Sequence, residues 1–353
     1  MGRLWLAVLL LAGCLSARAA SPLPEPIEAD WLVPDFRFHD GSHLEQMRLH
    51  YTTLGNPANP AVLVLHGTLG TGRGLLTPMF GEALFGPGQA LDAEHHFIIL
   101  PDGIGAGSSA KPSDGLRARF PRYNYDDCVE AQYRLVTEHL GISHLQAVIG
   151  YSMGGMQAWL WAGQHPAQMD VVVALAATPM AMSGRNWMMR RLVIDAIRND
   201  PEWQGGNYTQ QPRSLQFASV FFGLATVPGT LQLAQEAPDH AASDAWLDKR
   251  LQAPFKGDAN DHLYQWDASR DFDPVPTLGK VRARLLAVNS ADDPRNPPEL
   301  AVMERVIATL PQADFLLIPG SASTTGHATT LDASLWRARL ARQLQGLQGA
   351  TVP

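Results

Sequence analysis

The sequence contains very little cysteine, with only Cys14 and Cys128 among its 353 residues. Cys14 falls in an amino-terminal segment with the features of an export signal, so Cys128 is the one thiol expected in the body of the chain. An internal disulfide is therefore excluded. Cys128 lies in the helical pattern of residues 126–140, where we expect it to be a small core residue.

Basic residues are also too few for a nucleic-acid-binding protein. Lys and Arg together number 27 against 34 Asp and Glu, the formal net charge is −7, and no basic stripe is present. The sequence lacks internal repeats, heptad runs and long low-complexity tracts. With 46% hydrophobic residues, a chain of this length can bury one large core, which fits a single α/β domain carrying an insertion.

The motifs of nucleotide and metal sites are missing as well. Residues 67–74 are rich in glycine but lack the Lys followed by Ser or Thr of a phosphate-binding loop. In "PDGIGAGSS", Ser108 stands where a dinucleotide fingerprint needs its third glycine, so we interpret this stretch as a tight turn after a strand. The sequence contains neither H-E-x-x-H nor paired cysteines. We therefore expect no cofactor and no bound metal.

The amino terminus has the pattern of an export signal. Arg3 precedes an apolar run over residues 4–12, and Ala17-Arg18-Ala19 offers a cleavage site, which predicts a signal peptide over residues 1–19 and a periplasmic or secreted protein. The run is too short to span a bilayer. Alternatively, residues 11–14 resemble a lipobox, in which case Cys14 would be lipidated and the protein would be a membrane-anchored lipoprotein.

Short apolar runs alternate with helical patterns along most of the chain, which predicts a mostly parallel, doubly wound sheet. Between about residues 180 and 274 the pattern changes to Trp-, Met- and Gln-rich helical segments interrupted by prolines. We interpret residues 180–274 as a helical cap inserted between two parts of the core, 20–179 and 275–353. The expected strands are 61–66, 97–101, 145–150, 171–177, 285–289 and 315–318.

A serine between glycines is the first feature that indicates chemistry. In "QAVIGYSMGGMQAW", an apolar strand pattern passes into helical spacing, and Ser152 lies at the bend. Gly150, Ser152 and Gly154 fit G-x-S-x-G, the nucleophile elbow, in which a strained turn directs the serine Oγ outward above a sheet. We predict that Ser152 is a nucleophile; the competing interpretation is a structural turn serine.

A serine hydroxyl is a weak nucleophile, so Ser152 needs a general base and the base needs an orienting carboxylate. In folds with this elbow the order is Ser, acid, His, each on a loop after a strand. "LLAVNSADDPRNPP" supplies Asp292 and Asp293, and "FLLIPGSASTTGHATT" supplies His327. We choose Asp293 as the acid because of the Asp-Pro-x-x-Pro spacing, with Asp292 as the alternative, and His327 as the base rather than a surface histidine.

The oxyanion formed during acyl transfer needs hydrogen-bond donors. One is expected to be the backbone N–H of Met153, directly after the nucleophile, and the other comes from the loop after an early strand. In "VLVLHGTLGTG" that loop offers the Thr68 N–H. His66 beside it is expected to hold the loop rather than to bind a metal.

With these motifs in place, the chain resembles the homoserine O-acetyltransferase family of the α/β-hydrolase superfamily over nearly all of the portion after the signal. The resemblance implies the α/β-hydrolase fold with an inserted helical cap, an acyl ester on Ser152, and His327 and Asp293 completing a triad. It is carried by "FGPGQALD", "FPRYNYDDCVEAQ", "LGISHLQAVIGYSMGGMQAW", "AIRNDPEWQGGNY", "DANDHLYQWDASRDFD" and the Gly326-His327 pair.

Four departures from the family pattern concern the same site. Tyr151 replaces the usual glycine, and the oxyanion loop reads His-Gly-Thr-Leu-Gly instead of His-Ala-Leu-Thr-Gly. Ala328 follows the histidine where the family has Asp, and Ser219 aligns with a substrate-binding arginine of the family. These changes argue against homoserine binding unless another cap residue, such as Arg190 or Arg191, has taken over that role.

The sequence thus supports an exported serine hydrolase that cleaves a small ester or related acyl compound through an acyl-serine. The alternative is an O-acyltransferase of the homoserine O-acetyltransferase type with an acyl-CoA donor, and the third option is a non-catalytic binding module. Because Ser219 and Ala328 replace polar groups that would hold homoserine, we expect water rather than homoserine to accept the acyl group. The expected partner is a small acyl substrate, and the oligomeric state is left open, with a dimer as one option.

Overall fold

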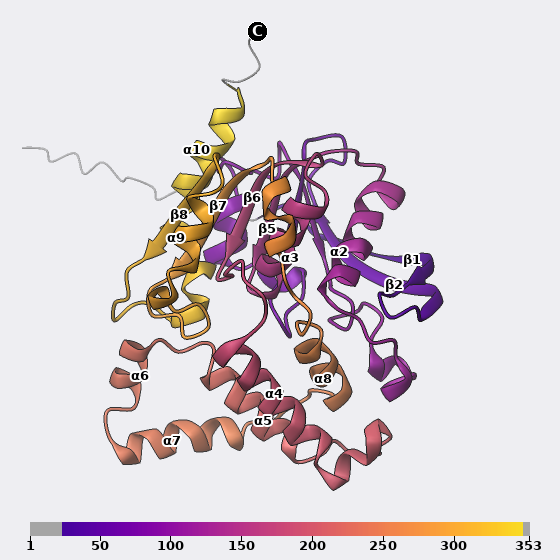
Figure 1. The fold of residues 1–353 in the computed structure, drawn as a ribbon, viewed down its shortest axis with the longest axis vertical. Coiled ribbons are helices and arrows are strands. Elements are labelled where there is room, and N and C mark those ends of the chain that lie inside the picture. Colours follow the sequence, from indigo (N-terminus) through magenta and orange to yellow (C-terminus); the bar gives the residue numbers. More distant parts are fainter. Residues whose placement is uncertain (1–22, 349–353) are drawn as a thin grey trace, which may run out of the picture.

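The computed structural model describes residues 23–348 and contains one sheet of eight strands, in the order β1-β2-β4-β3-β5-β6-β7-β8 (Figure 1). The six strands β3 to β8 are parallel to one another. Strands β1 and β2 form an antiparallel hairpin, and β2 joins the sheet by pairing antiparallel with β4. The bounds are β1 Ile27–Arg37, β2 His43–Leu54, β3 Ala61–Leu65, β4 Phe97–Pro101, β5 Leu145–Tyr151, β6 Met169–Leu175, β7 Arg284–Ser290 and β8 Ala313–Ile318.

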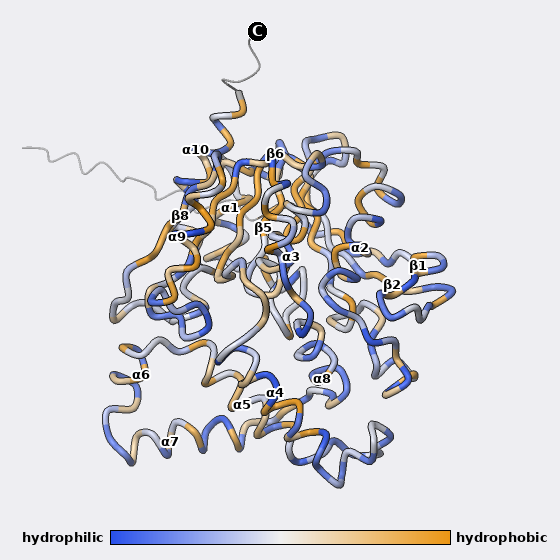
Figure 2. The backbone as a smooth tube through the Cα atoms, viewed as in Figure 1, coloured by the Kyte–Doolittle hydropathy of each residue, from blue (hydrophilic) through white to orange (hydrophobic). Residues whose placement is uncertain are grey.

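The six strands expected from apolar runs are confirmed as β3 to β8. The central strands are buried on both faces, which explains their near-continuous apolar sequence and their orange colour in Figure 2. The β1–β2 hairpin is an addition that the apolar runs do not predict. Strand β1 is largely exposed and β2 is exposed mainly over its first residues, and polar or charged residues interrupt both, so neither has a continuous apolar run.

Helices cover both faces of the sheet. On one face lie α2 (Tyr125–Arg134), α3 (Met153–Gln164) and α9 (Val302–Ile307), packed over a core that includes Trp159 and Trp161. On the other face lie α1 (Ala83–Phe85) and α10 (Arg337–Gln348), with Trp336 in the second core. The expected helix around Cys128 is confirmed, and the thiol is buried in the first core, where burial raises its pKa.

Five α-helices lie between β6 and β7 in the chain, and Figure 1 shows them together below the sheet. They are α4 (Gly184–Arg198), α5 (Ser214–Leu224), α6 (Thr230–Glu236), α7 (His240–Leu251) and α8 (Ala259–Asp267). Three of them, α4, α5 and α8, share a hydrophobic core of their own that contains Ile194, Phe222 and Trp266. We refer to residues 180–274 as the cap segment.

The export signal expected over residues 1–19, and Cys14 within it, lie outside the described residues. Among residues 23–348, no helix has both the length and the apolar character needed to cross a membrane.

Candidate active site

Ser152 occupies a sharp turn between β5 and α3. Its backbone has a φ of 55° and a ψ of −110°, a conformation that a non-glycine residue adopts only under constraint. The flanking glycines allow the turn, because a Cβ at Gly150 would collide with the Gly154 carbonyl and a Cβ at Gly154 with the Leu65 carbonyl. The turn therefore has the geometry that the G-x-S-x-G pattern predicts.

The structure brings Ser152, His327 and Asp293 together. The Ser152 hydroxyl lies 2.7 Å from Nε2 of His327, and Nδ1 of His327 lies 2.8 Å from the Asp293 carboxylate. The carboxylate fixes the tautomer with the proton on Nδ1, which leaves Nε2 free to accept the serine proton. His327 and Asp293 are buried, and Ser152 is only 8% exposed. This arrangement can activate the serine hydroxyl as a nucleophile.

The Asp293 carboxylate is held by two further contacts. It accepts hydrogen bonds from the Arg295 backbone N–H at 2.8 Å and from the Asn296 side chain at 2.8 Å. Burial by itself raises the pKa of Asp293, but the charge of His327 and these hydrogen bonds together lower it below its usual value. The carboxylate therefore stays ionised beside the histidine.

The neighbouring Asp292 faces different groups. It accepts hydrogen bonds from the Ser290 hydroxyl at 2.5 Å and from the Thr324 hydroxyl at 2.6 Å. No hydrogen bond joins Asp292 to His327 among the described residues. Asp292 instead links the end of β7 to the loop that carries the histidine, so the two adjacent carboxylates have different positions in the site.

Two backbone N–H groups near Ser152 are free to stabilise an oxyanion. Met153 is the first residue of α3, so its N–H has no acceptor within the helix. Within residues 23–348 neither the Met153 nor the Thr68 N–H donates a hydrogen bond to the protein. Both groups belong to segments joined by the hydrogen bond from the Gly154 N–H to the His66 carbonyl.

His66 holds the loop that carries Thr68, as the sequence predicts. Its Nδ1 donates to the Gly67 carbonyl, and its Nε2 accepts from the Gly103 N–H, both at 2.8 Å. Burial lowers the pKa of His66, which keeps the ring in the neutral form that these two bonds require. The imidazole therefore joins the Thr68 loop to the turn after β4.

Gln265 of α8 fixes the same loop from the cap segment, a contact that the sequence does not reveal. Its side-chain carbonyl accepts the Leu69 N–H at 2.8 Å, and its amide donates to the Gly105 carbonyl at 2.8 Å. Leu69 has a φ of 63°, so its backbone conformation needs such support. Gln265 lies in the segment "DANDHLYQWDASRDFD", but the sequence assigns it no role, which the tertiary contact identifies.

Tyr151, which departs from the family pattern, packs between the oxyanion loop and the histidine. Its ring centroid lies 5.5 Å from that of His327, and a Cβ at Gly67 would come within 2.9 Å of the tyrosine ring. Ser219 in α5 donates its hydroxyl to the Leu215 carbonyl one turn earlier. Its side chain is thus bonded within its own helix.

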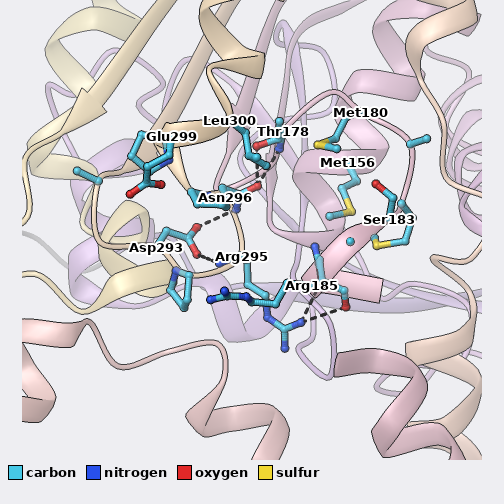
Figure 3. Close-up of a pocket in the computed structure, with 18 of the residues that line it drawn as sticks. Met156, Thr178, Met180, Ser183, Arg185, Asp293, Arg295, Asn296, Glu299 and Leu300 are labelled. Carbon is cyan, nitrogen blue, oxygen red and sulfur yellow. Dashed lines mark hydrogen bonds between the residues drawn. The ribbon is translucent and has the colours of Figure 1, made fainter. Parts of the chain in front are cut away.

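A pocket of about 590 Å³ opens beside Asp293 (Figure 3). Its walls come from the start of α4, from the loop after β7 and from Met156, which lies one turn after Ser152. The lining is mixed, with Met156, Met180, Met182 and Phe272 supplying apolar surface and Thr178, Ser183, Asn186, Arg185, Arg295 and Glu299 supplying polar groups. Such a lining suits a small molecule with both apolar and charged parts.

One group of side chains in the described part of the chain is close enough to share a metal ion. Ligand atoms of Asp92, Glu94 and His95 lie within 4.8 Å of one another. The Asp92 carboxylate already accepts the N–H groups of Gly88 and Glu94, as a turn residue does. Glu94 and His95 are exposed, and none of the three belongs to the Ser152 site.

Comparisons with known proteins agree with this architecture. A family model described as alpha/beta hydrolase fold matches residues 60–324. A "Probable acyltransferase" of Methanothermobacter thermautotrophicus is 29% identical over 314 residues, covering 86% of this chain and 93% of that protein. A homoserine O-acetyltransferase of Haemophilus influenzae is 32% identical over 294 residues, covering 71% and 79%. With the Thermobifida fusca homoserine O-acetyltransferase, the match spans 49% of each chain at 36% identity.

Solved structures show the same fold at lower identity. The homoserine O-acetyltransferase of Bacillus anthracis superposes with a TM-score of 0.76 at 21% identity, covering 90% of this chain and 97% of that one. An acetylester hydrolase of Corynebacterium glutamicum gives a TM-score of 0.74 at 21% identity, covering 92% and 95%. At these identities the likeness concerns the fold, which proteins named as transferases and as hydrolases share.

Proposed function

Because the chain belongs to the homoserine O-acetyltransferase-like branch of the α/β-hydrolase superfamily, we propose that it transfers acyl groups through an ester on Ser152. The observation that carries this proposal is the 2.7 Å contact between the Ser152 hydroxyl and Nε2 of His327. A hydroxyl held against an oriented imidazole is a nucleophile with its base in place. A binding module that had only kept the fold would not need this arrangement.

The geometry supports a two-step reaction. Ser152 Oγ attacks the acyl carbon while His327 takes the hydroxyl proton, and the resulting oxyanion accepts hydrogen bonds from the Met153 and Thr68 N–H groups. Collapse breaks the bond to the leaving group, which receives the proton from His327. In the second step the acceptor gives its proton to His327 and attacks the ester carbon; the bond to Ser152 Oγ then breaks, and His327 returns the proton to Oγ.

The acceptor in the second step is proposed to be an alcohol, which makes the protein an O-acyltransferase. The similar proteins of Methanothermobacter thermautotrophicus and Haemophilus influenzae are named as acyltransferases. Their names support acyl transfer more strongly than hydrolysis, the reaction that the sequence favours. The burial of Ser152 also favours transfer, because an ester protected from bulk water can persist until an acceptor binds. Hydrolysis is the second candidate. It is favoured by Ser219, whose hydroxyl is engaged within α5 and which replaces the expected arginine.

Partition of the acyl group between alcohol and water tests this choice. Purified protein is given para-nitrophenyl acetate or acetyl-CoA with increasing L-homoserine or another small alcohol, and acetate and acetylated alcohol are measured by mass spectrometry. We expect the acetylated alcohol to form faster than free acetate with at least one acceptor. Acetate accounting for all turnover at every acceptor concentration would make hydrolysis the function.

Export is proposed on the pattern of residues 1–19 alone. The amino-terminal residue of the mature protein distinguishes cleavage near Ala19 from lipidation at Cys14. A mature protein that still begins at Met1 would contradict export.

A further inference from the structure

Two arginines are buried beside the candidate site without a carboxylate partner. Arg190 of α4 is 3% exposed, and Arg295, two residues after Asp293, is 7% exposed. No ion pair between the described residues includes either guanidinium. A buried guanidinium normally has an acid beside it, because removing an unpaired charge from water is costly.

The two guanidinium groups share a hydrogen-bond acceptor and an aromatic ring. Arg190 Nε donates to Asn186 Oδ1 at 3.3 Å, and Arg295 Nη1 donates to the same oxygen at 3.0 Å. Both cations also pack against the Phe222 ring, with their Cζ atoms 5.5 and 4.6 Å from its centroid. One neutral amide oxygen thus serves two positive charges, at a position where a carboxylate would interact more strongly.

Neutral acceptors satisfy one of these cations and not the other. Arg295 donates from Nε and Nη2 to the Thr226 hydroxyl and from Nη1 to Asn186, whereas Arg190 Nη1 is buried and has no hydrogen-bond partner among residues 23–348. Each guanidinium has five N–H donors in a fixed plane, a geometry that matches the two oxygens of a carboxylate. Burial, followed by the charge of Arg190, lowers the pKa of Arg295 to about 9. Repulsion between the two cations would fall if an anion bound between them.

Further unsatisfied groups connect Arg190 to the oxyanion loop. The hydroxyls of Tyr125 and Thr68 are buried and have no partner within hydrogen-bond distance among the described residues. Burial raises the pKa of Tyr125, and the charge of Arg190 opposes this rise.

On its other side Arg295 borders the pocket, whose lining includes Asp293 but not Arg190, Ser152 or His327. Arg295 and Asn186 line it, next to Asp293 (Figure 3). The three carboxylates in the lining form no ion pair with either arginine among the described residues: Asp293 is bonded to His327, Asp292 is bonded to Ser290 and Thr324, and no salt bridge includes Glu299. A small anion that enters the pocket would thus meet the exposed Arg185 and the buried Arg295, which is linked to Arg190 through Asn186.

We propose that Arg190 and Arg295 bind a carboxylate of the substrate, so that the enzyme acts on acyl compounds that carry a negative charge. The carboxylate belongs either to the acyl group or to the alcohol of the ester. This proposal rests on the proposed acyl transfer through Ser152 and adds a charge requirement to it.

Two pairs of esters test the charge requirement and distinguish the two sources of the carboxylate. Para-acetoxybenzoate carries it on the alcohol side, and para-acetoxybenzamide is its neutral counterpart. Mono-para-nitrophenyl adipate carries it on the acyl side, and para-nitrophenyl hexanoate is its neutral counterpart. We expect the wild-type enzyme to prefer the charged member of one pair in kcat/KM by about tenfold or more, the ratio typical of a hydrogen bond to a charged group.

Charge-removing variants locate the effect. Arg190→Gln and Arg295→Gln should each reduce the preference for the charged ester by about tenfold, mainly through KM, while Arg190→Lys retains part of it. Arg191→Gln is the matched control. Arg191 is the next residue of α4, its side chain is 58% exposed and it pairs with Asp195, so its loss should leave the preference unchanged.

Two outcomes would overturn the proposal: a wild-type enzyme with no preference in either pair, or glutamine variants that retain the full preference. If the variants fail to fold, competitive inhibition of the wild-type enzyme by benzoate but not by benzamide provides the same test, and equal inhibition would count against an anion site. Fluorophosphonate labelling of Ser152 accompanies every assay. Labelling without charge preference refutes the anion site alone, whereas absent labelling refutes the acyl-serine function.

Discussion

At the residue scale, the chemistry of the site depends on which of two adjacent aspartates faces the histidine. Asp293 lies 2.8 Å from His327, and Asp292 bonds to Ser290 and Thr324 instead. The G-x-S-x-G pattern and the order of the three residues point to Ser152 and His327 in the sequence. They could not separate two neighbouring carboxylates, because the direction of each side chain depends on the backbone of the loop after β7.

Substitution of the two aspartates tests their roles. Asp293→Asn should lower kcat about 10³–10⁴-fold, because the amide no longer holds the His327 proton on Nδ1. Asp292→Asn should lower kcat by less than about tenfold, since the asparagine side-chain oxygen can still accept a hydrogen bond from the hydroxyl of Ser290 or Thr324. Both variants are assayed with para-nitrophenyl acetate, and their free energies of unfolding are compared with that of the wild type. The reverse ranking would assign the triad acid to Asp292.

Other residues of the site could not be found from sequence patterns. Asn296 holds both the Asp293 carboxylate and Thr178, and Arg295 reaches Asn186 and Thr226 in the cap segment. These contacts join positions far apart in the chain, and no local spacing encodes them. The sequence offers Arg190 or Arg191 as a replacement for the substrate-binding arginine of the family, but it does not predict Arg295, whose link to Arg190 through Asn186 depends on the packing of α4 over the loop after β7.

At the scale of elements, the strands of the parallel sheet were predictable and the hairpin before them was not. Strands buried on both faces need apolar side chains at nearly every position, which gives an unmistakable run. The β1–β2 hairpin is exposed on one side and mixes apolar with charged residues. One local signal was present: Asp40-Gly41 lies at the turn between them, with Gly41 at a φ of 84°.

Helix α8 has a position that connects the cap segment to the catalytic loops. Asp261 accepts hydrogen bonds from the backbone and the hydroxyl of Ser113, and Gln265 bonds to Leu69 and Gly105. The helix thus fixes two loops of the sheet domain from within the cap segment. Movement of α8 would change the orientation of the oxyanion loop.

Removing the Gln265 amide tests this connection. Gln265→Leu should lower kcat by about ten- to a hundredfold with little change in KM. Without the Gln265 contact the Thr68 N–H would be displaced, and its hydrogen bond to the oxyanion stabilises the transition state more than the bound substrate. Gln252→Leu, an exposed position at the end of α7, is the control and should leave kcat unchanged. Steady-state kinetics and thermal unfolding are measured for both. A Gln265 variant that unfolds more easily but keeps the wild-type kcat would make the residue purely structural.

At the scale of the whole molecule, the site lies where three hydrophobic cores meet. Two cores lie on the faces of the sheet, and the third lies within the cap segment among α4, α5 and α8. The triad comes from three loops of the sheet domain, while Arg190, Thr226 and Asn186 come from the cap segment. The sheet domain thus supplies the reacting groups, and the cap supplies the contacts that would select the substrate.

The central claim is that the acyl group is carried by Ser152, and intact-protein and peptide mass spectrometry test it most directly. Purified enzyme is mixed with para-nitrophenyl acetate and quenched with acid within the first turnover. The account predicts one acetyl group per chain, on the peptide that contains Ser152, formed together with the first equivalent of nitrophenolate, and no such adduct on Ser152→Ala. Acetylation of a different residue, or the same adduct and nitrophenolate release from the Ser152→Ala protein, would contradict it.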